Sequence, residues 1–388
     1  MRLLSFIYFL FFLRHGVVFP FIPLYAKHLG ASSISIGLVV SSFSFLSFLM
    51  AFPAGILSDK FGPKLTLLIG IIINILYSIL LLFSQDLWIL ISAQLIGGLS
   101  FLFMLVGSQV YISSQQDKRL VEKSFGWVTF SAALGQSIGP FLGGVLFSKF
   151  SFEGMFKFAI YIAITGLLVL GLKDRTFSKE SYSLSLKNLV RILKKILTSH
   201  VVAVFLFCFI VIFVISLRSS FLPILLKEKN LTEEEIGLLI SIFAIAMSLI
   251  RLFISRIFGS VSRLTLVITT LFLISISTGI LPLIDSKFIL SIPILMTGFG
   301  FGISQPLSMV MISDLVPTEY LGLSFGMRFS IITFAGVMGP SVFGLLIHRW
   351  GISFSFYAGS LLMITAGGII ITLLKRPKSS FGAGHTEI

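Results

Sequence analysis

Long apolar runs alternate with short polar connections along the whole chain. A run can cross a bilayer as a helix when it has about 20 mainly apolar residues. Twelve runs reach this length: Leu3–Tyr25, Ile34–Leu57, Leu65–Phe83, Leu87–Ser114, Phe125–Phe147, Met155–Leu172, Val201–Leu225, Ile236–Arg256, Leu264–Ile284, Phe288–Ser313, Leu321–Ile347 and Ile352–Leu374. The pattern therefore predicts an all-α membrane protein with twelve transmembrane helices.

The longest polar stretch, Lys173–His200, divides these runs into six and six. We interpret it as a cytoplasmic linker between an N-terminal bundle (1–172) and a C-terminal bundle (201–375), followed by a cytoplasmic tail (376–388). Within the linker, Leu184–Leu197 has an amphipathic pattern, which is typical of a helix lying along a membrane surface.

The two halves repeat each other at a constant offset of 200 residues. The matched positions are Pro23 and Pro223, Gly37 and Gly237, Gly98 and Gly298, Ser108 and Ser308, Gly139-Pro140 and Gly339-Pro340, and Gly144 and Gly344. Glycine, proline and serine do not recur in this way by chance in a chain dominated by Phe, Leu and Ile. The repeat predicts two pseudo-symmetric six-helix bundles, an architecture typical of secondary transporters.

Composition and charge support this interpretation. Hydrophobic residues make up 56% of the 388 positions and charged ones only 11%, which excludes a soluble core. The net charge of +14 does not indicate nucleic-acid binding, because the basic residues lie in the short connections.

Nineteen of the 29 Lys and Arg fall on the side of both chain ends, seven on the other side and three within the runs. This bias predicts that both termini are cytoplasmic, and we expect the chain to lie in the plasma membrane.

A short polar break, Gly55–Leu67, joins the second and third runs. Its motif residues are Gly55, Leu57, Asp59, Lys60, Gly62, Lys64 and Leu67. We expect Gly55 and Gly62 to allow a tight backbone, and Pro63 to begin the next helix. The motif resembles the signature loop of the major facilitator superfamily, although Pro63 replaces the Arg that usually pairs with the acid. The resemblance implies a cytoplasmic gating loop whose Asp contacts the start of the eleventh helix.

The fifth run carries a dense glycine motif, made of Gly135, Gly139, Pro140, Gly143 and Gly144. Glycines four residues apart allow two helices to approach closely, and proline bends a helix. The order also resembles the motif of the superfamily's antiporters, which favours export. The candidate coupling partner of the small-molecule substrate is a proton. A similar pattern recurs in the eleventh run, so close packing alone is the alternative explanation.

Eight polar or aromatic residues inside the runs are candidates for a substrate cavity: Arg14, His15, Phe19, Gln94, Gln109, Gln136, Arg218 and Gln305. An arginine at mid-membrane costs about 2.5–3.5 kcal/mol on insertion scales, so a lipid-facing position is disfavoured. The resemblance places Arg14 and Arg218 on the two helices that line the central cavity, although Arg218 can alternatively reach the membrane surface. For Arg328 we expect a contact with Asp314 or with lipid phosphate.

Proton coupling has few candidates. Gln94 stands nearest to the Arg that drug exporters of the superfamily carry in their fourth helix, and all fifteen acidic residues fall in loops, at helix ends or in the tail. His15 either titrates or hydrogen-bonds a neighbouring helix, and the sequence does not distinguish the two.

These features indicate a secondary transporter that moves a small organic solute by alternating access, as a monomer in the bilayer. Export of an amphipathic compound is favoured by the glycine motif and the aromatic residues. Transport of an organic anion or sugar is the alternative, favoured by the embedded arginines. A membrane enzyme needs a catalytic or metal constellation. The five histidines are scattered, so no catalytic residue, metal or cofactor is expected. A receptor would usually add a soluble domain.

Overall fold

The structure is a computed structural model that describes residues 2–113, 118–169, 197–317 and 320–375. Over these residues it is helical and contains no strand. The first half comprises α1 (Arg2–Val18), η1 (Phe19–Phe21), α2 (Ile22–His28), α3 (Ser33–Phe61), α4 (Pro63–Leu82), α5 (Leu87–Ser113) and α6 (Lys118–Leu168). The second half comprises α8 (Ser199–Glu228), α9 (Glu233–Leu252), α10 (Ile254–Ser260), α11 (Arg263–Ile280), η2 (Leu281–Leu283), α12 (Ser291–Leu315), α13 (Leu321–Trp350) and α14 (Ile352–Leu374). Nearly all of the amphipathic stretch predicted at Leu184–Leu197 lies outside the described residues.

Eleven helices of the described chain are long and apolar enough to cross a membrane. One of them, Lys123–Leu168, has 46 residues. At about 1.5 Å per residue a straight helix of that length would be roughly twice the bilayer core. The chain turns back at Ser151, whose φ is 58°. The helix therefore contains both the fifth and the sixth predicted spans, and the twelve-span fold is confirmed.

The backbone itself follows the 200-residue repeat. Ser151 (φ 58°) corresponds to Gly351 (φ 86°), which separates α13 from α14. Asn230 (φ 60°) corresponds to Gly30 (φ 82°). Positive φ is easy for glycine and costly for residues with a Cβ. Both halves therefore place the same turns at equivalent positions, with glycine in only one member of each pair.

The signature loop is shorter than the sequence suggests. Helix α3 continues to Phe61 and α4 begins at Pro63, so Gly62, with φ 84°, is the only residue between them. The prediction for Gly55 is wrong: it is helical, and a Cβ there would meet no atom within 4 Å. Pro63 occupies the first turn of α4 as expected. The reversal therefore depends on Gly62 alone.

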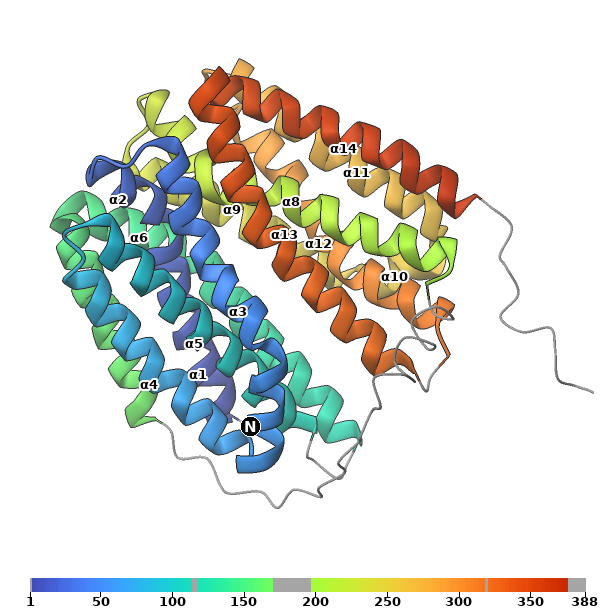
Figure 1. Cartoon of the computed structure of the whole chain (residues 1–388), viewed down its shortest axis with the longest axis horizontal. Helices are drawn as coiled ribbons and strands as arrows, with labels where there is room; N and C mark the ends of the chain where they lie inside the picture. Colours follow the sequence, from blue (N-terminus) through green and yellow to red (C-terminus); the bar gives the residue numbers. More distant parts are fainter. Residues whose placement is uncertain (1, 114–117, 170–196, 318–319, 376–388) are drawn as a thin grey trace, which may run out of the picture.

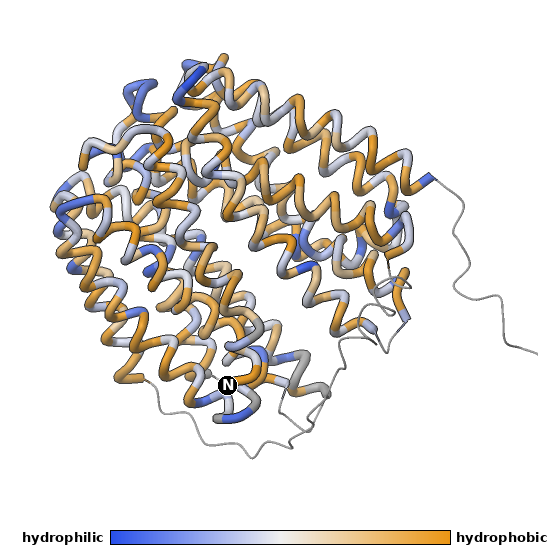
Figure 2. The backbone as a smooth tube through the Cα atoms, in the orientation of Figure 1, coloured by the Kyte–Doolittle hydropathy of each residue, from blue (hydrophilic) through white to orange (hydrophobic). Residues whose placement is uncertain are grey.

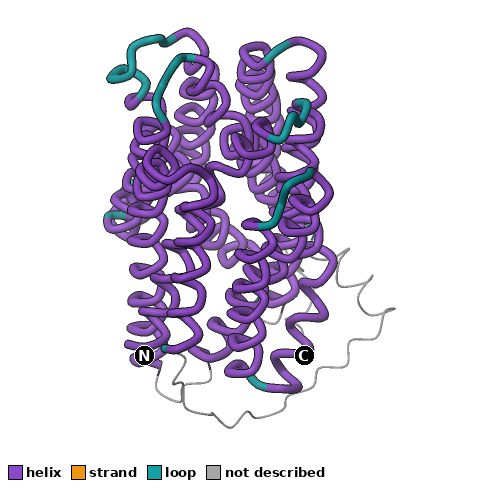
Figure 3. The backbone as a smooth tube through the Cα atoms, turned by 90° about the vertical axis from the view of Figure 1, so that its left-hand side faces the viewer, coloured by secondary structure: helices purple, strands orange, loops and turns teal. Residues whose placement is uncertain are grey.

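The helices form two bundles, α1–α6 and α8–α14 (Figure 1). The main contacts between the bundles are α3 with α13 and α6 with α9. The two bundles converge at the end where α2 lies and diverge toward the end where α1 begins (Figure 1). Helix α14 ends on the side where the two bundles diverge (Figure 1). The described backbone is helical apart from short connections (Figure 3). Apolar residues run along the helices, and the most hydrophilic ones gather at the helix ends (Figure 2).

Candidate functional site

A cavity of about 210 Å³ lies between the two bundles. Its walls come from α1, η1, α5 and α6 of the first half and from α8 and α9 of the second. Most of its lining is apolar, and the polar side chains among the described residues are His15, Gln136, Arg218 and Ser219. An apolar pocket with a few convergent polar groups is the usual form of a small-molecule site.

Arg218 is the charged residue of this cavity. It lies on α8, its side chain is buried with 7% exposure, and it lines the cavity. The alternative that it reaches the membrane surface is therefore wrong. Its guanidinium carbon lies 3.6 Å from the centre of the Phe243 ring, within cation–π range. Its Nε has no hydrogen-bond partner among the described residues.

The opposite wall is aromatic. His15 stacks on Phe19 with ring centroids 4.7 Å apart, and it contacts Phe101 at 5.4 Å and Phe43 at 5.5 Å. His15, Phe19 and Phe101 line the cavity, and so does Gln136 of α6. The structure thus brings four of the eight predicted residues together: His15, Phe19, Gln136 and Arg218.

Arg14 and Gln94 lie elsewhere, inside the first bundle. Arg14 is 2% exposed; its Nε donates to the Ser78 Oγ at 3.2 Å, and its guanidinium carbon lies 4.0 Å from the centre of the Tyr77 ring. Gln94 is fully buried and donates from Nε2 to the Tyr77 hydroxyl at 3.1 Å. Neighbouring residues on a helix point about 100° apart. When His15 faces the cavity, Arg14 therefore faces away from it, which corrects its predicted placement.

The remaining predicted residues do not line the cavity either. Gln109 is exposed on α5. Gln305 accepts a hydrogen bond from Arg328 Nη2 at 2.7 Å through its Oε1. Arg328 Nε also donates to the Ser308 Oγ at 2.9 Å, and Arg328 is only 6% exposed. The expected contact of Arg328 with Asp314 is wrong, because Asp314 pairs with Arg263 at 3.4 Å.

Sequence reasoning missed the aromatic partners of the cavity. Phe243, on α9, packs under Arg218, and Phe101, on α5, packs against His15. With 42 phenylalanines in the chain, composition offers no signal that distinguishes these two.

Two helix crossings bring the bundles together where they converge. A Cβ added to Gly237 of α9 would lie 2.2 Å from the Pro140 carbonyl oxygen of α6. A Cβ on Gly37 of α3 would lie 2.4 Å from the Pro340 carbonyl oxygen of α13. These two contacts are related by the 200-residue repeat. Glycine permits this close approach because it has no side chain.

The same repeat relates the hydrogen bonds of the crossings. The Phe141 backbone N–H donates to the Ser241 Oγ at 3.0 Å. In the other crossing, the Ser41 and Ser341 hydroxyls lie 2.8 Å apart. Ser41 also donates to the Val337 carbonyl at 2.7 Å. Each crossing therefore combines a glycine contact with serine hydrogen bonds.

The glycine motif of the fifth span uses two faces of α6. Gly135, Gly139 and Gly143 face α1: a Cβ on them would lie 2.6 Å from the Leu13 nitrogen, 2.7 Å from the Gly16 Cα and 2.3 Å from the Val17 carbonyl oxygen, respectively. Pro140 and Gly144 face α9, and a Cβ on Gly144 would lie 2.4 Å from the Glu233 carbonyl oxygen. The motif thus joins α6 both to its own bundle and to the other one.

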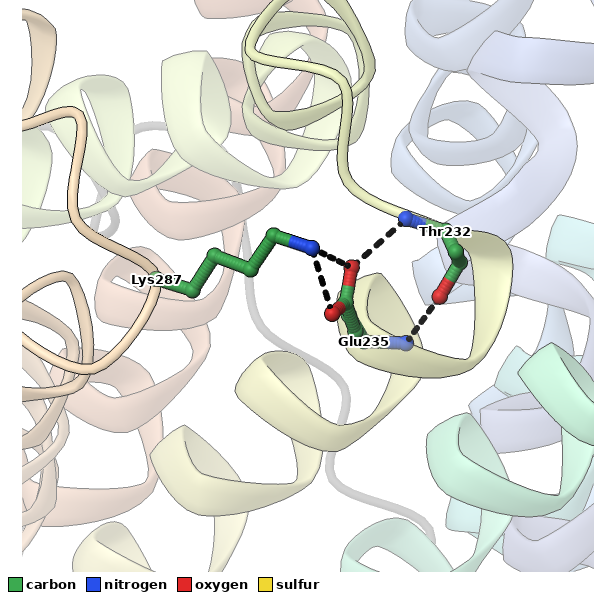
Figure 4. Close-up of polar contacts among 3 residues, drawn as sticks. All are labelled: Thr232, Glu235 and Lys287. Carbon is green, nitrogen blue, oxygen red and sulfur yellow. Dashed lines mark hydrogen bonds and ion pairs between the residues drawn. The ribbon is translucent and has the colours of Figure 1, made fainter.

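Polar contacts also lie at the end where the two bundles converge. Lys27 of the first half pairs with Glu228 of the second at 3.2 Å. Figure 4 shows the start of α9, where Thr232 and Glu235 form a capping box and Glu235 also pairs with Lys287 at 2.8 Å. The box satisfies backbone N–H groups at the helix start, and Lys287 links α9 to the connection before α12. Exposed pairs of this kind contribute about 0.2–1 kcal/mol each.

The predicted gating loop lies at the opposite end. Lys60, in the last turn of α3, is exposed, and Lys64, in the first turn of α4, is half-buried. Asp59 belongs to α3, but its side chain is outside the described part of the structure, so its predicted contact with the start of α13 stays a prediction.

Comparisons of the sequence and of the fold with known proteins agree with each other. A family model described as Major Facilitator Superfamily matches residues 4–340 and 204–386. Multidrug resistance protein 1 of Bacillus subtilis (strain 168) is 24% identical over 376 residues, covering 94% of this chain and 93% of that protein. Quinolone resistance protein NorA of Staphylococcus aureus (strain MRSA252) is 29% identical over 161 residues, covering 42% of this chain and 41% of that protein. The crystal structure of the nucleoside transporter NupG superposes with a TM-score of 0.82 at 14% identity, covering 97% of this chain and 99% of that one, which shows a shared fold.

Proposed function

Because this chain belongs to the major facilitator superfamily, and is thus a multi-pass membrane transporter and not an enzyme, we propose that it exports an amphipathic small molecule by alternating access. The observation that carries this proposal is the mainly apolar cavity between the two bundles. Two of the similar proteins are named for multidrug and quinolone resistance, which agrees with export. The transporter acts as a monomer in the plasma membrane, with both termini in the cytoplasm.

The alternating-access cycle follows from the two crossings. In this structure the bundles touch through Gly237 with Pro140 and through Gly37 with Pro340, at the end that we assign to the outside. Opening the cavity outward requires these contacts to separate while the opposite end closes. Two rigid bundles that rock about a central site account for this exchange.

Transport of a panel of compounds tests the proposal. Proteoliposomes containing the purified full chain would be given cationic dyes, neutral amphiphiles and organic anions, with and without an imposed pH gradient. We expect accumulation of at least one amphipathic class, and collapse of the gradient with an ionophore shows whether a proton is the coupling partner. Failure to move any compound above the level of protein-free liposomes contradicts the exporter proposal.

The proposed topology makes its own prediction. In a Cys208→Ser background, cysteines introduced at Asp86 and Ser286 should react with a membrane-impermeant thiol reagent applied to intact cells. A cysteine at Ser262 should react only after the membrane is permeabilised. All three positions are exposed in the structure, so accessibility to solvent does not limit the reaction. Labelling of Ser262→Cys in intact cells would show that the orientation is the reverse of the one proposed.

We propose that the loop around Asp59 acts as a gate at the cytoplasmic end. Asp59→Asn is expected to lower the transport rate about tenfold or more without lowering expression. The reason is that the carboxylate would stabilise the start of α13, where free backbone N–H groups favour an anion. Asp86→Asn, in a connection at the other end, is the matched control. Normal transport by a well-expressed Asp59→Asn variant would count against a gate.

A further inference from the structure

The cavity holds a cation whose charge no described residue of its lining balances. Arg218 is 7% exposed, and its Nε lacks a hydrogen-bond partner within the described chain. Among the described residues that line the cavity, none is acidic. A buried charge without a partner is costly, and a ligand of opposite charge removes part of that cost.

We infer that the cavity takes amphipathic anions, with a carboxylate or sulfonate head at Arg218 and an apolar body against the wall formed by His15, Phe19 and Phe101. This inference rests on the proposed transport function and specifies its substrate class.

The position of Phe243 suits this role. The guanidinium carbon lies 3.6 Å from the ring centre, so a face of the guanidinium group is covered by the ring. The N–H donors of a guanidinium lie in its plane and point outward from its edge. Stacking on Phe243 therefore orients the group and leaves its edge available to two oxygens of an anion. Such charge-assisted, two-point contacts are the stronger kind of hydrogen bond.

A cationic substrate fits the site poorly. It would meet Arg218 in a low-dielectric cavity, where repulsion between like charges is several times stronger than in water. The sequence offers no acid to offset it, because all fifteen acidic residues fall in loops, at helix ends or in the tail. Arg14 does not line the cavity; its guanidinium lies over Tyr77 inside the first bundle.

A matched ligand series tests the inference. Naphthoate, naphthamide and naphthylmethylammonium share a ring system and differ in the charge of the head group. Their binding to the purified full chain would be measured by isothermal titration calorimetry at neutral pH. We expect naphthoate to bind about ten- to a hundredfold more tightly than naphthamide, as for a hydrogen bond to a charged group, and the ammonium compound to bind most weakly.

Variants then assign this preference to the residue. Arg218→Gln should remove the preference for naphthoate, and Arg218→Lys should keep part of it. Arg349→Gln, which removes an exposed arginine at the end of α13, should leave it unchanged. Phe243→Leu keeps the cation but removes the ring that orients it, so it should weaken naphthoate binding more than naphthamide binding. It also provides the test if Arg218→Gln does not fold.

The inference is overturned if naphthoate shows no measurable binding, if the ammonium compound binds as tightly as naphthoate, or if the preference for naphthoate is undiminished in both Arg218→Gln and Phe243→Leu. These results are separable from the transport proposal. Gradient-driven transport of cations without any anion preference would leave the exporter intact and remove the anion site. Selective binding of naphthoate by a chain that transports nothing would do the reverse.

Discussion

Gly237→Ala is expected to reduce transport at least about fivefold while leaving the helices intact. The added Cβ would lie 2.2 Å from the Pro140 carbonyl oxygen and 3.0 Å from its carbon. Both are backbone atoms, so no side chain can rotate away to make room. Forcing an extra methyl group into a tight contact costs about 1–3 kcal/mol. This free energy destabilises the conformation in which the outer end is closed. It lowers the population of that conformation, relative to the open one, by roughly 5- to 150-fold.

The change in population can be measured directly. In a Cys208→Ser background, a cysteine at Ser219 would report on the cavity, which Ser219 lines. An impermeant thiol reagent added outside should label this cysteine faster in the Gly237→Ala variant, because the closed end opens more often. Gly37→Ala should act in the same way, because a Cβ there would lie 2.4 Å from the Pro340 carbonyl oxygen.

Gly326→Ala is the matched control. Gly326 lies within α13, which also packs against α3, but a Cβ there would meet nothing within 4 Å. Alanine is a better helix former than glycine, so this variant should transport normally. If both Gly237→Ala and Gly37→Ala also transport at the normal rate with unchanged labelling, the crossings of α6 with α9 and of α3 with α13 are not the outer closure.

Much of the fold could be predicted from the sequence because bilayer thickness constrains helix length. The twelve runs correspond to helices, and the repeat of glycine, proline and serine extends to backbone geometry at Ser151 and Gly351. Boundaries were less predictable. Helix α3 continues past Gly55 to Phe61, because a helix can extend beyond the apolar layer, whereas the turn at Ser151 falls inside the predicted connection between Phe147 and Met155.

The orientation of each helix about its own axis was the part that the sequence did not reveal. In water, an apolar stripe shows which face of a helix is buried. In a bilayer, both lipid and neighbouring helices are apolar, so this contrast is weak. Arg14 and His15 are adjacent in sequence, yet one lies inside the first bundle and the other lines the cavity. The repeat does not help here, because Arg14 and Arg218 are not 200 residues apart.

The second large effect concerns the polar network inside the first bundle. Tyr77→Leu is expected to lower the free energy of unfolding by about 3–5 kcal/mol, the sum of about 2 kcal/mol for a desolvated cation–π contact and about 1–3 kcal/mol for a buried amide left without its partner. Tyr77 is 1% exposed, its ring lies under the Arg14 guanidinium at 4.0 Å, and its hydroxyl accepts from Gln94 at 3.1 Å. Leucine leaves the cation and the amide buried without these partners. Tyr161→Leu is the control, because Tyr161 is 70% exposed on α6 and should change stability by no more than about 0.5 kcal/mol.

A double variant separates the effect of leaving the Arg14 charge without its partner from the effect of removing the volume of the Tyr77 ring. Replacing a buried charge together with its partner by apolar groups is often neutral or stabilising. Arg14→Met combined with Tyr77→Leu should therefore recover much of the stability lost in Tyr77→Leu, as measured by thermal unfolding in detergent. The double variant should also bind naphthoate like the unmodified chain, because neither residue lines the cavity. Suppose instead that the double variant regains stability but loses the preference for naphthoate over naphthamide. The charge of Arg14 would then act in the cavity, in agreement with the two-arginine site that the sequence predicts.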